Sequence, residues 1–196
     1  DVRHVAAIKE ALGDRASVRV DVNQAWDEST AVYGIQALQD AGIELIEQAI
    51  PAREHAGLIR LADRFNVPML ADEAVQDARD GLDLARGGFS GAFALKIAKS
   101  GGLRAVLELA HVAQAAGIGL YGGTLLEGTI GTAASLHAWA TLPEMAWGTE
   151  MFGPLLLKDD IVVEPLRYRE FGVDLPAGPG LGINLDEDKL AHYARK

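Results

Sequence analysis

Four charged residues recur along the chain at nearly even spacing, each at the end of a short apolar run. Asp21, Glu47, Asp72 and Lys96 lie 26, 25 and 24 residues apart. Three carboxylates brought close together repel one another unless a cation binds between them, and oxygen ligands of this kind favour Mg²⁺ or Mn²⁺ over zinc or copper. The spacing therefore predicts one divalent metal site, with Asp21, Glu47 and Asp72 as its ligands.

Lys96 closes the apolar run at 92–95 and is expected to join the same group of side chains. Its ammonium could act as base, acid or fixed positive charge. Either Glu150 or Glu127 could hydrogen-bond to Lys96 and hold it, although Glu127 fits equally well as an acidic residue in the first turn of a helix. We therefore predict Lys96 and Glu150 as catalytic residues. The residues predicted to contact the substrate or to support the ligands are Asn23, Glu73 and Glu127.

The elements that would position these residues alternate in a regular way. Short apolar runs and amphipathic helical stretches follow one another, which is typical of βα units around a parallel sheet. Strands are predicted at 17–22, 43–48, 67–71, 92–97, 118–121 and 145–152, and helices at 2–12, 31–40, 56–65, 75–86, 104–116 and 130–141. A βα unit of a TIM-type barrel takes about 30 residues. The charged residues thus occupy equivalent strand ends, which should converge at one mouth of a barrel.

The pattern divides the chain into two parts. Residues 1–153 would form barrel βα units with about six strands, whereas a closed barrel of this type needs about eight, so the first strands would be missing. Residues 154–196 carry Pro and Gly without the βα pattern and would form a tail that closes the barrel. Within the tail we predict edge strands at 161–165 and 168–175 and a last helix at 186–195.

Composition narrows the class of protein. With 196 residues, of which 49% are apolar, the chain can bury a substantial core. The net charge of −10 argues against a nucleic-acid or anionic-membrane partner, because phosphate binding needs clustered Lys and Arg. The absence of cysteine excludes disulfides and Cys-ligated zinc and suits a cytoplasmic location. No apolar run reaches the ~20 residues that span a bilayer.

Several segments resemble the muconate-lactonising subgroup of the enolase superfamily. They are RVDVNQAW at 19–26, LIEQ at 45–48, ADE at 71–73, ALKIAK at 94–99, LYGGTLLEG at 120–128 and WGTEMFGP at 147–154. The last two are most similar to members that cycloisomerise muconate. The resemblance implies a (β/α)7β barrel of the enolase superfamily whose first strands and N-terminal capping domain are absent from this chain. The tail would pack on that capping domain.

The resemblance also implies an isomerase activity. Cis,cis-muconate would cyclise reversibly to muconolactone in catechol catabolism, with a substrate carboxylate on Mn²⁺ or Mg²⁺ and an enolate intermediate stabilised by the metal. The proton would come from a lysine of a Lys-x-Lys pair on a strand before residue 17, and Lys96 would stand on the opposite face. Without that pair, we expect this chain alone to be inactive. A small dicarboxylate substrate and a homo-oligomer, commonly an octamer, are also implied.

Alternative functions remain open from the sequence. A dipeptide epimerase, an N-acylamino acid racemase or an o-succinylbenzoate synthase would use the same metal and lysines, and chlorinated muconates are also possible substrates. A non-catalytic, metal-binding half-barrel is the alternative from another class. Ala49 stands where similar proteins usually carry proline, and Pro51 follows two residues later, so we expect a slightly repositioned ligand loop.

Overall fold

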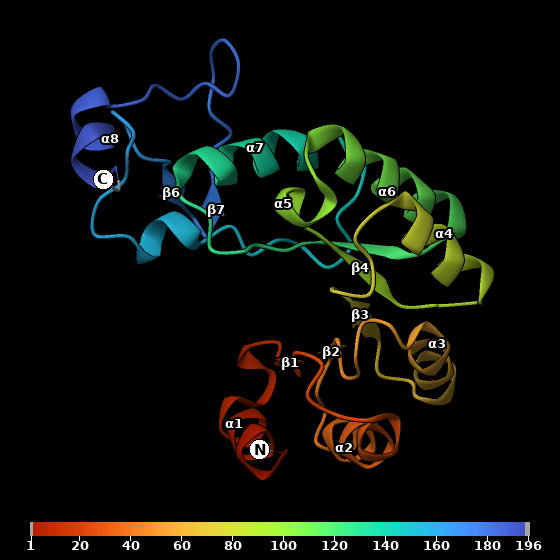
Figure 1. The fold of residues 1–196 in the computed structure, drawn as a ribbon. Coiled ribbons are helices and arrows are strands. Elements are labelled where there is room, and N and C mark those ends of the chain that lie inside the picture. Colours follow the sequence, from red (N-terminus) through yellow and green to blue (C-terminus); the bar gives the residue numbers. More distant parts are fainter. Residues whose placement is uncertain (1, 195–196) are drawn as a thin grey trace. The chain divides into compact units, whose positions relative to one another are not determined.

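The computed structural model describes residues 2–194, in which five short strands form one sheet in the order β1-β2-β3-β4-β5 (Figure 1). The strands are β1 (Arg19–Asp21), β2 (Leu45–Glu47), β3 (Met69–Ala71), β4 (Ala92–Leu95) and β5 (Gly119–Gly122). The first four pair in parallel in chain order. This arrangement confirms the predicted α/β class with a parallel sheet. Each strand is shorter than its predicted range.

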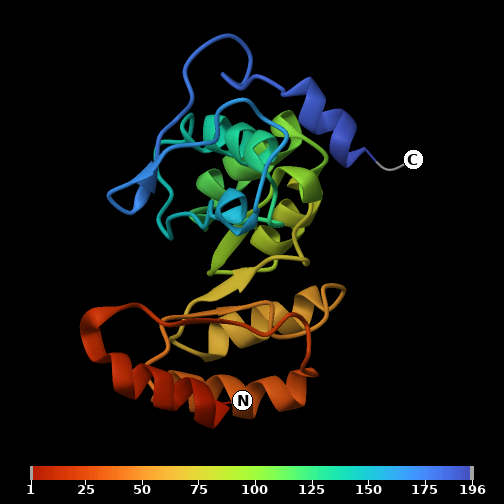
Figure 2. The ribbon, with the colours of Figure 1, turned by 90° about the vertical axis from the view of Figure 1, so that its left-hand side faces the viewer.

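The chain divides into two compact units. The first unit comprises Asp1–Ala94 and Glu108–Leu120, and the second comprises Leu95–Leu107 and Tyr121–Lys196. All five strands place residues in the first unit, which also contains α1 (Val2–Leu12), the 3-10 turn η1 (Gly13–Arg15), α2 (Glu28–Asp40), α3 (His55–Arg64) and α4 (Ala78–Arg86). In Figure 2, α1 and α2 lie side by side along the β1 and β2 strands.

Two aspartates set the starts of helices in the first unit. The Asp27 side chain accepts a hydrogen bond from Thr30 N, so α2 begins at Glu28, three residues before the predicted start. The Asp77 side chain caps α4 by accepting from the first backbone N–H groups of that helix, and α4 therefore begins at Ala78. The prediction of a helix from residue 75 was wrong at this end, because the capping residue has extended backbone.

The core of the first unit is aliphatic and comes from the strands and from one face of each helix. The fully buried side chains on α2, α3 and α4 include Ile35, Leu38, Leu58, Leu61 and Leu84. On the strands, Leu45, Ile46, Met69, Leu70 and Phe93 are equally inaccessible to solvent. Consecutive residues of β3 and β4 are buried, which is typical of parallel strands that are covered on both faces.

The second unit is less regular. Its helices are α5 (Ile97–Ser100), the start of α6 (Leu103–Ala116), α7 (Thr129–Trp139), the 3-10 turn η2 (Gly153–Leu156) and α8 (Glu187–Tyr193). A short antiparallel hairpin, β6 (Tyr168–Arg169) and β7 (Gly172–Val173), occupies part of the predicted edge strand at 168–175. The predicted strand at 161–165 is only a single bridge from Val162 to Leu185. The predicted end of the last helix at Arg195 lies outside the described residues.

The predicted strand at 145–152 was wrong in extent. Gly148 N donates to Met145 O at 2.8 Å and Gly148 has φ 73°, which makes a turn of the first half of the segment. Only Thr149 pairs in parallel with Gly122, and Glu150 N donates to Gly122 O at 3.0 Å. The left-handed backbone of Gly148 interrupts a regular strand directly before Thr149, the residue that pairs with Gly122.

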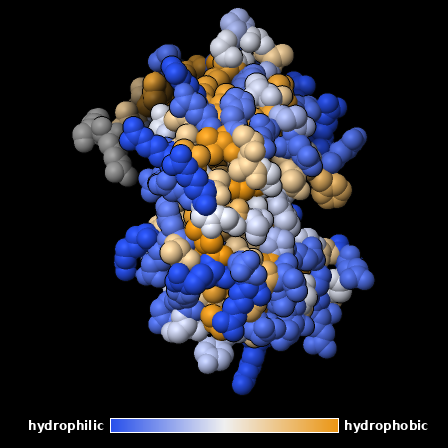
Figure 3. All heavy atoms as spheres, turned by 90° about the vertical axis from the view of Figure 1, so that its right-hand side faces the viewer, coloured by the Kyte–Doolittle hydropathy of each residue, from blue (hydrophilic) through white to orange (hydrophobic). Residues whose placement is uncertain are grey.

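Charged and polar side chains cover most of the surface in Figure 3, with apolar atoms showing between them. Several large apolar side chains of the second unit are exposed, namely Leu125, Leu126, Leu155, Leu156 and Phe171. Within residues 2–194, none of the helices has the length and apolar character needed to cross a membrane.

Candidate functional site

Two predicted metal ligands, Asp21 and Glu47, are register partners. They are the last residues of β1 and β2, which pair in parallel with Asp21 opposite Glu47. Register partners on neighbouring strands project from the same face of a sheet. The Asp21 side chain is exposed and accepts a hydrogen bond from Asn23 N at 2.8 Å, and Glu47 is half-buried. The backbone therefore brings these two carboxylates to one edge of the sheet.

The third predicted ligand, Asp72, is the first residue after β3. The register pairs Glu47 with Leu70, so Asp72 lies two residues beyond the partner of Glu47. Because side chains alternate between faces, a displacement of two residues keeps the same face. Asp72 is 5% exposed. Carboxylates thus stand at or directly after the ends of three consecutive strands, as predicted. Asp72 lies two residues further along than the register partner of Glu47.

The side chains themselves are not gathered into a closed cluster. Among residues 2–194, no three His, Asp or Glu side chains are close enough together to hold a metal ion. Carboxylates repel one another at short range, and the two-residue offset of Asp72 adds to its separation from Asp21 and Glu47. The structure therefore brings the three backbone positions to the same edge without bringing the three carboxylates together.

Glu73, predicted as a supporting residue, has an unusual environment. Its Oε2 is buried and has no hydrogen-bond partner among the described residues. A buried carboxylate oxygen without a partner is costly, and a nearby positive charge offsets the cost. Its position directly after Asp72 places this orphaned oxygen in the same loop as a predicted metal ligand.

Sequence reasoning missed Gln48. This residue is completely buried. Its carboxamide hydrogen-bonds to the backbone of the loop that follows β2 and to the backbone of the loop that follows β3. The signal in the sequence is weak: Gln48 is a second polar residue, directly after Glu47, between apolar residues at 45–46 and 49–50. Its hydrogen bonds join residues far apart in the chain, which no local pattern shows.

In the second unit, Lys96 is 7% exposed and occupies the N-cap position of α5. It follows the last residue of β4 directly, so the predicted strand at 92–97 ends earlier than expected. Its aliphatic stem packs on Gly123, where an added Cβ would lie 2.7 Å from Lys96 Cε and 3.1 Å from Cγ. Gly123 N also donates to Leu95 O at 3.0 Å. A side chain at position 123 would therefore require the Lys96 side chain to shift from its present position.

The two predicted glutamates of the second unit both contact Thr124. Glu150 Oε1 accepts from Thr124 N at 3.2 Å. Glu127 Oε2 accepts from Thr124 Oγ1 and from Leu125 N, which closes a turn over 124–127. The alternative role of Glu127 in the first turn of a helix was wrong, because α7 begins at Thr129 with Gly128 as its N-cap. The first turn of α7 contains no acidic residue.

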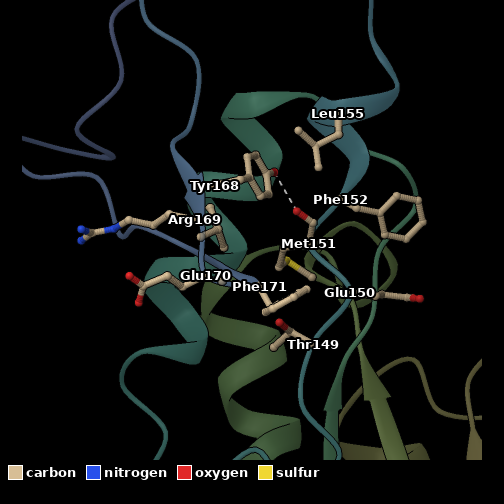
Figure 4. Close-up of a pocket in the computed structure, with 11 residues that line it drawn as sticks. Thr149, Glu150, Met151, Phe152, Leu155, Tyr168, Arg169, Glu170 and Phe171 are labelled. Carbon is tan, nitrogen blue, oxygen red and sulfur yellow. Dashed lines mark hydrogen bonds between the residues drawn. The ribbon is translucent and has the colours of Figure 1, made fainter. Parts of the chain in front are cut away.

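A cavity of about 530 Å³ in the second unit is lined by Glu150, its neighbours and the β6–β7 hairpin. The Tyr168 hydroxyl donates to Met151 O at 2.7 Å, and burial raises the pKa of Tyr168. Figure 4 shows Glu150 directed away from Tyr168. Phe171 at the hairpin tip is fully exposed. The walls are mainly apolar, and the sequence did not predict this cavity.

Comparison with known proteins places these features in a family. The family described as "Enolase C-terminal domain-like" matches residues 1–189. Muconate cycloisomerase 1 of Pseudomonas putida is 56% identical over 196 residues, covering 100% of this chain and 52% of that protein. A chloromuconate cycloisomerase of Pseudomonas sp. (strain P51) is 48% identical over 195 residues, covering 100% of this chain and 53% of that protein.

Solved structures agree with the sequence relatives. The muconate lactonizing enzyme from Klebsiella pneumoniae has a TM-score of 0.97 and 63% identity, covering 100% of this chain and 55% of that one. The chain spans about half the length of the curated relatives that it matches. Since the family match extends over almost all of its residues, the chain belongs to the enolase C-terminal domain-like family.

Proposed function

We propose that this chain supplies the metal ligands and part of the acid/base machinery of a muconate cycloisomerase, which converts cis,cis-muconate reversibly to muconolactone. The observation that carries the proposal is the placement of carboxylates at the ends of three consecutive strands, with Asp21 and Glu47 in register. Relatives at 56% and 52% identity over the full chain are named for this reaction.

The predicted ligands fit a divalent cation in two respects. Asp21, Glu47 and Asp72 provide only oxygen donors, the type that Mg²⁺ and Mn²⁺ prefer. The buried Glu73 Oε2, which lacks a partner among the described residues, would be stabilised by positive charge nearby. When bound, Mn²⁺ or Mg²⁺ would supply Lewis-acid stabilisation of negative charge that develops on the substrate.

Lys96 is the group that we propose for acid/base or electrostatic work on the dicarboxylate. Its burial strengthens the electrostatic interaction of its ammonium with an anionic substrate, because water screens it less. The roles of acid, base or fixed positive charge all require the lysine stem to be held in one orientation, which Gly123 permits. Glu150 holds the loop that carries Gly123 through its hydrogen bond to Thr124 N.

Identity favours muconate over chlorinated muconates as the substrate. Two relatives named muconate cycloisomerase are 56% and 52% identical, whereas two named chloromuconate cycloisomerase are 48% and 47% identical. A dipeptide epimerase, an N-acylamino acid racemase and an o-succinylbenzoate synthase remain the alternatives on the same site.

The larger architecture is part of the proposal. We infer a (β/α)7β barrel in which 1–153 supply βα units and 154–196 close it and pack on a capping domain. The exposed apolar side chains of the second unit, among them Leu125, Leu155 and Phe171, would be covered in such an assembly or in a homo-oligomer. An octamer and a cytoplasmic location complete the proposal.

A hybrid enzyme tests the activity. The chain replaces the matching half of the Pseudomonas putida enzyme, and the hybrid is supplied with Mn²⁺ and cis,cis-muconate. We expect muconolactone, and we expect Lys96→Ala to lower kcat by at least about 100-fold, while Lys99→Ala, within the helix α5 that Lys96 precedes, leaves it unchanged. A folded hybrid that consumes a dipeptide or a chlorinated muconate but not muconate would overturn the substrate assignment.

A further inference from the structure

The carboxamide of Gln48 joins two loops that follow neighbouring strands. Gln48 comes directly after Glu47, is completely buried and has φ 34°, in the left-handed region. Its Nε2 donates to Ile50 O at 2.9 Å. Its Oε1 accepts from Asp72 N at 2.9 Å and from Ala74 N at 3.1 Å. One side chain therefore ties the loop after β2 to the loop after β3.

The three partners determine which side chain can occupy this position. The N–H groups of Asp72 and Ala74 only donate, and Ile50 O only accepts, so the side chain must both accept and donate. A carboxylate would place a second acceptor against Ile50 O, and an apolar side chain would leave three backbone groups without these partners. The loop that follows β3 is itself a closed turn, because Val75 N donates to Asp72 O at 3.0 Å.

A second glutamine repeats this arrangement one strand earlier. Gln24 Oε1 accepts from Ala52 N at 2.9 Å, which ties the loop after β1 to the loop after β2. Gln24 N also donates to Gln48 O at 2.7 Å. Both glutamines have left-handed backbone, with φ 62° at Gln24 and 34° at Gln48. The loops that follow β1, β2 and β3 are therefore connected in series.

We infer that Gln48 is a positioning residue that sets the distance and orientation between the carboxylates of Glu47 and Asp72, an inference that rests on the proposed metal site. Glu47 is joined to Gln48 through the chain, and Asp72 N is bound to its side chain, so a shift of Gln48 moves the backbone beneath both ligands. Loss of groups that orient metal ligands typically weakens metal binding by about 10- to 100-fold.

The chain offers a matched control at the opposite end of β3. Gln39 Oε1 accepts from Asn66 N at 2.8 Å and from Val67 N at 3.0 Å, just before that strand. Gln39 and Gln48 thus each hold two backbone N–H groups beside the same strand with one oxygen. Of these two glutamines, only Gln48 forms its hydrogen bonds at the end of β3 where Asp72 lies. If Gln48 only stabilised the fold, replacing either glutamine should therefore have the same effect on metal binding.

The test measures Mn²⁺ affinity and the electron paramagnetic resonance spectrum of bound Mn²⁺ in the 196-residue chain and its variants. Gln48→Met keeps the side-chain length and removes the three hydrogen bonds. Gln48→Asn keeps the amide but is too short to reach both loops. We expect both variants to bind Mn²⁺ at least about tenfold more weakly and to change the fine structure of the spectrum. Gln39→Met should lose thermal stability but keep the affinity and the spectrum.

The outcomes separate the two proposals. A folded Gln48 variant with unchanged affinity and spectrum would contradict the positioning role and leave the metal site standing. An equal loss of affinity in Gln39→Met, or unfolding of both Gln48 variants by circular dichroism, would show a purely structural role and overturn the inference. If the unchanged chain bound no Mn²⁺, the metal site and the positioning role would both fail.

Discussion

Asp21 and Glu47 face each other in register at the ends of two neighbouring parallel strands. Like charges directly opposite on neighbouring strands are destabilising. In the presence of a chelator, we therefore expect Asp21→Asn to raise the melting temperature of the chain. In the presence of Mn²⁺ the unchanged chain should have the higher melting temperature, because bound metal stabilises it more than it stabilises Asp21→Asn. Asp63→Asn, at an exposed position of α3, is the control and should show neither effect. A lower melting temperature for Asp21→Asn in chelator would contradict the repulsion.

Gly123→Ala should reduce turnover by displacing Lys96. The new methyl group would lie 2.7 Å from Lys96 Cε, so the lysine side chain must move. We expect kcat of the hybrid enzyme to fall by at least about tenfold, because a displacement of about 1 Å can cost 100-fold in rate. Gly172→Ala provides the control, since its added Cβ meets only Arg169 O at 3.5 Å, an ordinary contact. Normal kcat in a folded Gly123→Ala hybrid would contradict the role of Gly123 in holding the Lys96 side chain.

The ion pair between Glu28 on α2 and Arg60 on α3 should make stability depend on pH. The Arg60 guanidinium donates to Glu28 Oε1 at 2.7 Å and lowers the pKa of Glu28 below its ordinary value of 4.5. Because the folded-state pKa is depressed, the stabilisation is present above about pH 4.5 and is lost as the pH falls through the folded-state pKa.

Glu28→Gln is therefore expected to lower the melting temperature at neutral pH and to have no effect in acid below that folded-state pKa. Added salt should narrow the neutral-pH difference, since the pair is partly exposed. Thermal melts of both chains across the pH range measure this. A difference that persists undiminished in acid would assign the effect to packing instead of charge.

Phe93 should dominate the stability of the first unit among single side chains. It is completely buried on β4 and stacks on Phe89 at 5.9 Å between ring centroids. Phe93→Ala removes a large side chain from a close-packed region and should lower the free energy of unfolding by about 3–5 kcal/mol. Denaturant unfolding measures the loss, with Phe171→Ala at the exposed hairpin tip as the control. If Phe93→Ala lowered the free energy of unfolding no more than the control does, the prediction would be wrong, and the neighbouring side chains would have to repack and fill the cavity.

The sequence predicted well those features that depend on local periodicity. Asp21, Glu47, Asp72 and Lys96 stand at or directly after the ends of successive strands, as their even spacing indicated. Seven of the eight α-helices in the described residues lie close to the predicted ranges, because most of them have one apolar face, whereas the short helix α5 was not predicted. Their starts were less accurate, since capping by Asp77 depends on one hydrogen-bonded side chain and not on the repeat.

The features that the sequence did not predict depend on contacts between distant residues. Gln48 bonds to Asp72 and Ala74 across 24 and 26 residues, and no local pattern shows such a contact. The packing of Lys96 on Gly123 is likewise non-local. The strand predicted at 145–152 shows the opposite error, because an apolar run was taken for a strand although the left-handed Gly148 ends the regular backbone.

The measurement that tests the central claim most directly is a titration of the 196-residue chain with Mn²⁺, followed by electron paramagnetic resonance. We predict one ion per chain, with binding lost in a variant that combines Asp21→Asn, Glu47→Gln and Asp72→Asn. A matched variant neutralises Asp63, Asp83 and Glu108, carboxylates on α3, α4 and α6, and should bind as the unchanged chain does. Unchanged Mn²⁺ binding when the three strand-end carboxylates are neutralised would contradict the account.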